Sequence, residues 1–130
     1  MKKLSLPTPE REVFIDITEQ VAATVRGASF KGSACLVYSP HTTAGLTINE
    51  CADPDVVLDM RTALGELVAD DHRWRHREGN SPAHVKASLM GTSVIVPVVD
   101  GKLALGRWQG VFFCEFDGPR TREVWVRFLS

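Results

Sequence analysis

The spacing of apolar residues predicts three helices along the chain. The first follows Asp16 and Glu19, which have the spacing of a capping box, and Gly27 is predicted to end it. Its apolar face repeats at helical spacing and consists of Ile17, Val21 and Val25. This pattern is typical of an amphipathic helix.

The two other helices are each predicted from a cap residue followed by proline at the first helical position. They cover Pro54–Val68 and Ser81–Met90, and Gly91 is expected to stop the second. The helical stripe of the first contains Val57, Leu58, Arg61, Leu64, Leu67 and Val68. Between them, the stretch Asp70–Asn80 is too rich in charge to be core.

Short β-rich or alternating runs predict the strands. They cover Glu12–Ile15, Ala34–Tyr38, Gly45–Asn49, Ser93–Val99, Lys102–Leu105, Gln109–Phe116 and Arg122–Leu129. Asp100-Gly101 is a strong signal for a tight hairpin, and Asp117–Arg120 is predicted to join the last two strands as a pair. Helices set between groups of antiparallel strands indicate a β-rich α+β fold, in one domain over 1–130.

The last predicted strand has two unlike faces. Val124, Val126 and Phe128 share one face. The opposite face carries Glu123, Trp125, Arg127 and Leu129. An apolar face backed by an amphipathic one predicts a sheet that covers other elements or meets a partner chain.

Composition narrows the function classes. The 130 residues carry 15 basic and 16 acidic side chains, so no global field favours nucleic acid or an anionic membrane. No apolar run approaches the roughly 20 residues that span a bilayer, and the N-terminus lacks the apolar segment of a signal peptide. Three cysteines show no metal-ligand spacing, and Cys35 and Cys114 lie in apolar runs. We therefore expect a reducing, cytoplasmic compartment.

The histidines are the main candidates for chemistry. The stretch Asp70–His84 holds His72, His76 and His84, whereas His41 lies alone upstream. Neutral imidazole is a common metal ligand, and a catalytic zinc typically takes three protein ligands. His41 completes such a set only if the fold brings it there, and spacing alone favours ordinary loop histidines. His72 is assigned to a solvated turn.

Two carboxylates have alternative interpretations. Glu50 could orient an imidazole or act as a general base, or it could cap the turn that follows it. Glu115 interrupts an apolar strand, and a buried unpaired carboxylate is costly. Its partner is expected among Arg107, Arg120 and Arg122. A structural ion pair and a functional role for Glu115 are equally open.

Four further residues are candidates for substrate binding. Trp108 and Gln109 lie between two glycines, where the indole could stack on a flat ligand or simply add core mass. Arg120 follows a rigid Gly-Pro turn and could clamp a phosphate or carboxylate. Asn80 ends the charged loop before the last helix. Together they suggest a polar, anion-binding pocket.

The order of four motifs adds a resemblance. SPHTTAGLTINE, WRH, GNSPAHVKASLMGTS and GKLALGRWQGVFFCEFDGPRTR resemble the YjbQ-like family, from about Thr18 to the C-terminus. The resemblance implies a compact α+β domain that forms a homotrimer. It also implies a cluster of His41, His76 and His84, with Glu50, Trp108, Gln109 and Glu115 nearby.

The resemblance further implies a secondary thiamine-phosphate synthase activity, which joins a pyrimidine diphosphate to a thiazole phosphate. The leading hypothesis is therefore an enzyme in which His41, His76 and His84 surround a divalent metal, zinc or magnesium, or a bound anion. Glu50 would orient a group or accept a proton. The alternatives are a non-catalytic binding protein for a phosphorylated metabolite and a structural trimer with vestigial histidines.

Overall fold

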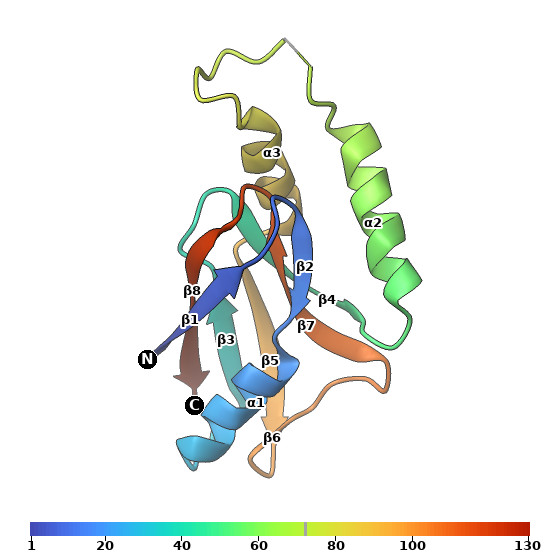
Figure 1. The fold of residues 1–130 in the computed structure, drawn as a ribbon. Helices are drawn as coiled ribbons and strands as arrows, with labels where there is room; N and C mark the ends of the chain where they lie inside the picture. The colour runs from blue at the N-terminus through green and yellow to red at the C-terminus, as the bar shows by residue number, and fades with distance from the viewer. Residues whose placement is uncertain (72) are drawn as a thin grey trace.

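Two antiparallel β-sheets and three helices make up the domain (Figure 1). The computed structural model describes residues 1–71 and 73–130, so His72 lies outside the described residues. The five-stranded sheet contains β1 (Lys2–Thr8), β8 (Arg120–Leu129), β3 (Ala34–Tyr38), β5 (Ser93–Val99) and β6 (Lys102–Leu103), in that order. The three-stranded sheet contains β2 (Val13–Asp16), β7 (Gln109–Glu115) and β4 (Ala44–Glu50). The predicted α+β class is confirmed.

The main core lies where both sheets meet α1 (Thr18–Gly27). Val21 and Val25 of α1 are buried, as is Ile17, so the predicted apolar face is confirmed. Valine, leucine and phenylalanine from both sheets complete the cluster, for example Val37 and Phe113. Burial of this apolar surface is the dominant stabilising contribution to such a domain.

The end of α1 differs from the prediction. Gly27 is still helical, and the left-handed residue is Ser29, with a φ of 50°. The N–H of Ser29 donates to the carbonyl of Arg26, and the N–H of Phe30 donates to that of Val25. This is the bonding of a Schellman motif, with serine where glycine is usual. At the other end, the Asp16 carboxylate binds the N–H of Thr18 rather than completing a capping box.

The last two strands do not pair with each other, contrary to the prediction. β7 lies between β2 and β4, and β8 lies between β1 and β3, so each already has two neighbours. The short connection between them carries the chain from one sheet to the other. The sequence did not predict β1, which pairs with β8 at the edge of the sheet. β1 contains charged residues and a proline, which edge strands tolerate.

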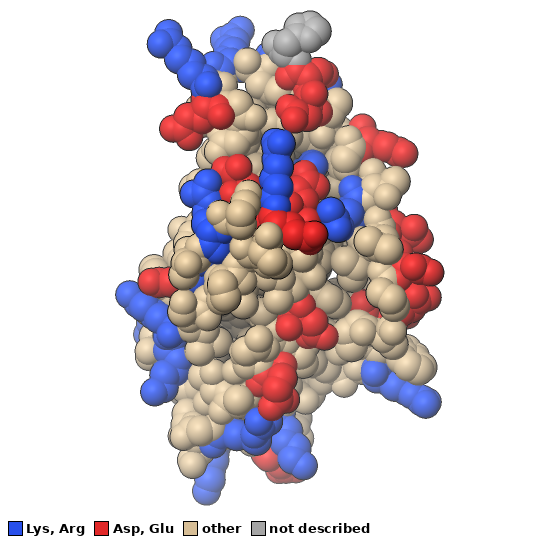
Figure 2. Space-filling view, viewed as in Figure 1, with Lys and Arg blue, Asp and Glu red and all other residues tan. Residues whose placement is uncertain are grey.

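The helix α2 (Pro54–Leu67) has the predicted bounds within one residue, but it lies along the outside of the domain (Figure 1). None of its residues is buried. Val57, Met60 and Leu64 pack against a second apolar cluster, whereas Leu58 and Leu67 are 51% and 76% exposed. Acidic side chains gather over this helix in the space-filling view (Figure 2). α3 (Ser81–Met90) has the predicted bounds.

The two faces of β8 are confirmed. Val124 and Val126 are buried in the core, while Glu123 and Arg127 on the opposite face are exposed. Cys35 and Cys114 are buried and Cys51 is exposed, and all three are free thiols. Burial raises the pKa of Cys35 and of Cys114. No helix in the described part of the chain has the length and apolar character needed to cross a membrane.

Candidate active site

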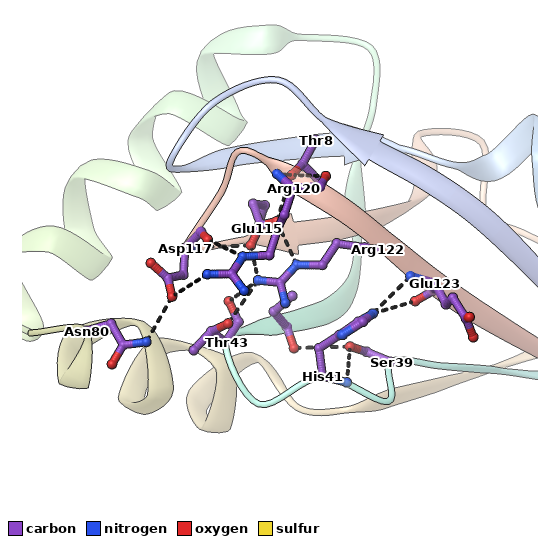
Figure 3. A network of polar contacts seen from close by, with 11 residues as sticks. Thr8, Ser39, His41, Thr43, Asn80, Glu115, Asp117, Arg120, Arg122 and Glu123 are labelled. Carbon is purple, nitrogen blue, oxygen red and sulfur yellow. Dashed lines mark hydrogen bonds and ion pairs between the residues drawn. The ribbon is translucent and has the colours of Figure 1, made fainter. Parts of the chain in front are cut away.

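A pocket of about 350 Å³, lined almost entirely by polar residues, lies where the β3–β4 loop, the start of α3 and the β7–β8 connection meet. We call it the polar pocket. Its hydrogen-bond donors are His41, Thr42, Thr43, His84, Arg120 and Arg122. Its acceptors are Glu78, Asn80 and Asp117. Segments far apart in the sequence therefore converge here, as Figure 3 shows for most of these residues.

An ion pair between Glu115 and Arg122 forms the base of the polar pocket (Figure 3). Arg122 Nε donates to Glu115 Oε1 at 2.7 Å, and its Nη2 bonds the other carboxylate oxygen. The Thr8 hydroxyl donates to Oε1 at 2.8 Å and the Asp117 N–H to Oε2 at 3.1 Å. Glu115 is fully buried and Arg122 is 4% exposed. The predicted ion pair is confirmed, and Arg122 is the partner, rather than Arg107 or Arg120.

These bonds decide the charge of Glu115. Burial alone would raise the pKa of Glu115, but the Arg122 guanidinium, the Asp117 N–H and the Thr8 hydroxyl together hold this pKa below its usual value. The carboxylate is therefore ionised at neutral pH, and all its bonds are within the protein. Arg122 Nη2 also donates to Thr43 Oγ1 at 2.9 Å, which fixes the pocket wall to the ion pair.

Asp117 holds Arg120 and Asn80 at the rim of the polar pocket. Arg120 Nε donates to the Asp117 carbonyl at 2.8 Å, and Asn80 Nδ2 donates to Asp117 Oδ2 at 2.8 Å. Asn80 is the N-cap of α3 but makes no side-chain cap bond. In the part of the chain that the structure describes, its buried Oδ1 has no hydrogen-bond partner.

His41 is held by the backbone of β8. Its Nε2 lies 2.9 Å from the backbone nitrogen of Glu123, whose N–H it accepts in one tautomer, and 3.2 Å from the Glu123 carbonyl oxygen, to which it donates in the other (Figure 3). Burial and the neighbouring Arg122 charge lower the pKa of His41 below 6.5. The ring is therefore neutral at neutral pH, and its Nε2 is held by the Glu123 backbone.

His76 and His84 lie beside each other. Their ring centroids are 5.4 Å apart, with the planes at 88°. His84 lines the polar pocket and also a neighbouring hollow that Trp74 and His76 line. His76 Nε2 lies 3.6 Å from Glu78 Oε2. The fold thus brings His84 to the same pocket as His41. His76 lies beside His84 but does not line the polar pocket.

A divalent metal site requires several ligand side chains that converge on one point. Among residues 1–71 and 73–130, no group of three or more His, Cys, Asp and Glu side chains is close enough to hold a metal ion. His41 Nε2 is already engaged by the Glu123 backbone. The three predicted histidines therefore do not fit a single metal site within one chain, although His76 and His84 are close enough to share one.

Three predicted residues lie at the other end of β4 and β7. Glu50 is paired with Gln109, whereas the Glu115 end of the ladder is paired with Ala44. Six residues of strand separate these ends, which is about 20 Å. Glu50 lines a separate cleft beneath α2. In the single chain it lies apart from the imidazoles.

The environments of Gln109 and Trp108 are local. The Gln109 side chain accepts the Gly106 N–H at 2.7 Å. Trp108 is 54% exposed, and the Arg107 guanidinium lies 4.9 Å from its ring centroid. Neither residue lines the polar pocket. Sequence reasoning missed Thr42, Thr43 and Asp117, and the run of two threonines after His41 was the available signal.

Comparison with known proteins identifies relatives of the whole chain. The model of the family described as UPF0047 protein YjbQ-like matches residues 2–130. The chain belongs to the YjbQ-like UPF0047 family. The UPF0047 protein YugU of Bacillus subtilis is 48% identical over 131 residues, covering 100% of this chain and 99% of YugU. A UPF0047 protein of Methanocaldococcus jannaschii is 45% identical, covering 98% of this chain and 93% of that protein.

Solved structures of YjbQ-like proteins share the fold. An uncharacterised conserved protein of this family from Clostridium acetobutylicum has a TM-score of 0.96 at 46% identity, covering 99% of this chain and 100% of that one. A conserved hypothetical protein from Thermus thermophilus has a TM-score of 0.92 at 46% identity, with coverage of 99% and 100%. A YjbQ-like protein from Sulfolobus solfataricus, described as of unknown function, has a TM-score of 0.91 at 32% identity, with coverage of 96% and 92%.

Proposed function

We propose that the polar pocket binds the phosphate group of a phosphorylated small molecule and that the protein is an enzyme acting on it. The observation that supports this is the convergence of two guanidinium groups, two threonines and two imidazoles on one cavity. Guanidinium groups match phosphate geometry, and preorganised donors stabilise charge that develops during a reaction.

The residues are proposed to divide the work. Arg120, whose side chain is half exposed, reaches the phosphate directly, while buried Arg122 contributes charge from the base of the pocket. His41 lines the pocket with its ring held by the Glu123 backbone, and His84 transfers a proton to or from the reacting group. Asn80 is held by Asp117 and shapes the rim of the pocket.

The reaction proposed from the resemblance is of the thiamine-phosphate synthase kind. In it, a pyrimidine diphosphate and a thiazole phosphate are joined, and the leaving diphosphate takes the electron pair of the bond that breaks. Arginine side chains around a leaving diphosphate lower the barrier by stabilising its charge. In this proposal, the diphosphate occupies the polar pocket.

Turnover separates an enzyme from a binding protein. The full chain is incubated with the pyrimidine diphosphate and the thiazole phosphate, and product is followed by chromatography. We expect product from the wild type and a loss of about a hundredfold or more in rate for His84→Ala. Saturable binding of both precursors without product would favour the alternative, a non-catalytic binding protein for a phosphorylated metabolite.

A metal, zinc or magnesium, remains part of the proposal from the resemblance. The single-chain geometry predicts that any metal held by the histidines depends on His76 and His84 but not on His41, because Glu123 occupies His41 Nε2. Elemental analysis of purified His76→Ala, His84→Ala and His41→Ala variants measures this. Equal loss of metal in all three would contradict the geometry and restore the three-histidine set.

Assembly as a homotrimer is proposed as well. The open face of the five-stranded sheet exposes Tyr38, Ile95 and Val99, which are 37%, 60% and 58% exposed. Exposed apolar patches of this kind often mark contacts between proteins. We expect Ile95→Asp to reduce the mass measured by light scattering from that of three chains to one, and an unchanged mass would argue against this face. The cytoplasm is the proposed location, supported by three free thiols.

A further inference from the structure

A second cavity lies away from the polar pocket. It has a volume of about 590 Å³ and is formed by the end of α1, the loop after it and the β5–β6 turn. Figure 1 shows this end of α1 and β6 at the opposite end of the molecule from the α2–α3 connection. We call it the α1 cavity. Its volume is typical of small-molecule sites, which range from about 300 to 1,000 Å³.

An apolar wall lines one side of the α1 cavity. Val25 is almost fully buried, and Phe30 packs against the main core. The Phe30 ring stacks on Phe128, with centroids 4.7 Å apart and planes at 22°. This stacking fixes the orientation of the Phe30 ring. The α1 cavity thus offers a rigid apolar surface next to solvent.

Backbone geometry holds the rest of this wall in place. The Schellman motif at Ser29 fixes the chain between Val25 and Phe30. A Cβ atom at Gly32 would lie 2.2 Å from the Phe30 ring and 2.5 Å from the Leu129 carbonyl, so only glycine allows the chain to pass this close. The N–H of Val98 donates to the Ser33 carbonyl at 2.8 Å and ties the loop to β5.

The rim of the α1 cavity is positively charged. Arg26, Lys31 and Lys102 come from three separate segments, against one carboxylate, Asp100. Arg26 is already paired with Glu19 at 2.7 Å. In the described part of the chain, Lys31 and Lys102 have no salt bridge, so their charges are available to a ligand. Basic side chains gather at this end of the molecule in Figure 2.

We propose that the α1 cavity binds a small amphiphilic anion. Its apolar or aromatic part packs against Val25 and Phe30, and its carboxylate, sulfonate or phosphate group lies between Lys31 and Lys102. A concave apolar surface with a few convergent polar groups is the usual form of a small-molecule site. The excess of cations selects an anion, and the site is independent of the polar pocket.

Chemical-shift mapping on the full chain tests this proposal with two matched probes. Naphthalene-2-sulfonate supplies an aromatic anion, and 2-naphthylmethylammonium supplies the same ring with a positive charge. We expect saturable shifts of backbone N–H signals at 29–32 and 100–102 with the sulfonate, and affinity weaker by about tenfold or more for the ammonium. Shifts confined to other residues, or equal affinity for both probes, would overturn the proposal.

Charge reversal tests the role of the lysines. The variant with Lys31→Glu and Lys102→Glu should bind the sulfonate about tenfold more weakly or worse, because both cations near the anion are reversed. Lys2→Glu, an exposed lysine on β1, is the matched control and should leave the affinity unchanged. The dispersion of the same spectra shows that each variant is folded. Unchanged affinity in the double variant would overturn the assignment of the site.

Discussion

The two ends of the β4–β7 ladder carry a glutamate each, in opposite settings. At one end, Glu115 is fully buried and bonded by side chains from β1 and β8 as well as its own turn. At the other end, the carboxylate of Glu50 lines an open cleft beneath α2. The sequence offered both as candidate site residues. Only Glu115 is bonded to a residue of the polar pocket, Arg122.

This difference shows what builds the site. Glu115 on β7 is bonded by Thr8 on β1, 107 positions away, and by Arg122 on β8, so the base of the polar pocket is fixed by the packing of the two sheets. The side-chain contacts of Gln109 and Trp108 at the other end are to residues within three positions along the chain. A fixed set of donors is what transition-state stabilisation requires, and local surface contacts do not supply it.

The largest predicted difference between the two ends is in stability. Glu115→Gln leaves the Arg122 charge buried without its counter-ion and should lower the free energy of unfolding by about 3–5 kcal/mol. Glu50→Gln, at the other end, should change it by less than about 0.5 kcal/mol. Urea denaturation of both variants measures the two values. Similar losses of unfolding free energy in the two variants would contradict the proposed difference between the two ends of the β4–β7 ladder.

The pH dependence sharpens this contrast. Because the pKa of Glu115 is lower in the folded state, its contribution to stability is present above about pH 4.5 and declines as the pH falls below that value. Glu115→Gln should remove this part of the acid sensitivity. Replacing both Glu115 and Arg122 by methionine should cost less than the sum of the single replacements, since neither charge is then left alone.

The next effect concerns His41, at the pocket end. His41→Gln removes the ring that hydrogen-bonds the Glu123 backbone and should lower the free energy of unfolding by about 1 kcal/mol at neutral pH. The wild type should lose this contribution as the pH falls below 6.5, because the unfolded chain binds the proton more readily. Thermal denaturation from pH 7.5 to 5.0 tests this. A wild type that gained stability relative to the variant on acidification would contradict a neutral His41.

The smallest effect is predicted at the far end. Gln109→Ala removes one exposed bond, to the Gly106 N–H, and should lower the free energy of unfolding by about 0.5 kcal/mol. Binding of a phosphorylated ligand should stay unchanged. A large loss of ligand affinity in this variant would place Gln109 in the site and move the site away from the polar pocket.

Most elements could be predicted because their signals are local. Cap residues, prolines and apolar spacing determine α2, α3, β3 and β5, and the structure matches these within one residue. β1 could not be predicted, since an edge strand with lysines and a proline is stabilised by its pairing with β8 rather than by its own pattern. The predicted pairing of β7 with β8 was also wrong. Short connections usually join paired strands, but this one carries the chain from one sheet to the other.

Less of the candidate site than of the fold could be predicted from the sequence. His41, Asn80, His84 and Arg120 were selected by residue type, and the fold places them around one cavity. The roles of Asp117, Thr8 and Thr43 depend on contacts with residues up to 112 positions away, which no local pattern reveals. Glu50 is separated from the histidines by the length of β4. This separation could not be predicted without knowing that β4 pairs with β7 over its whole length.

Isothermal titration calorimetry with inorganic diphosphate tests the central claim most directly. Two arginines serve as a matched pair: Arg120 at the polar pocket and Arg107 beside Trp108 at the far end. We predict saturable binding to the wild type, a loss of about tenfold or more in affinity for Arg120→Ala, and no change for Arg107→Ala. Equal affinities in all three proteins, or a loss only in Arg107→Ala, would contradict a phosphate site in the polar pocket.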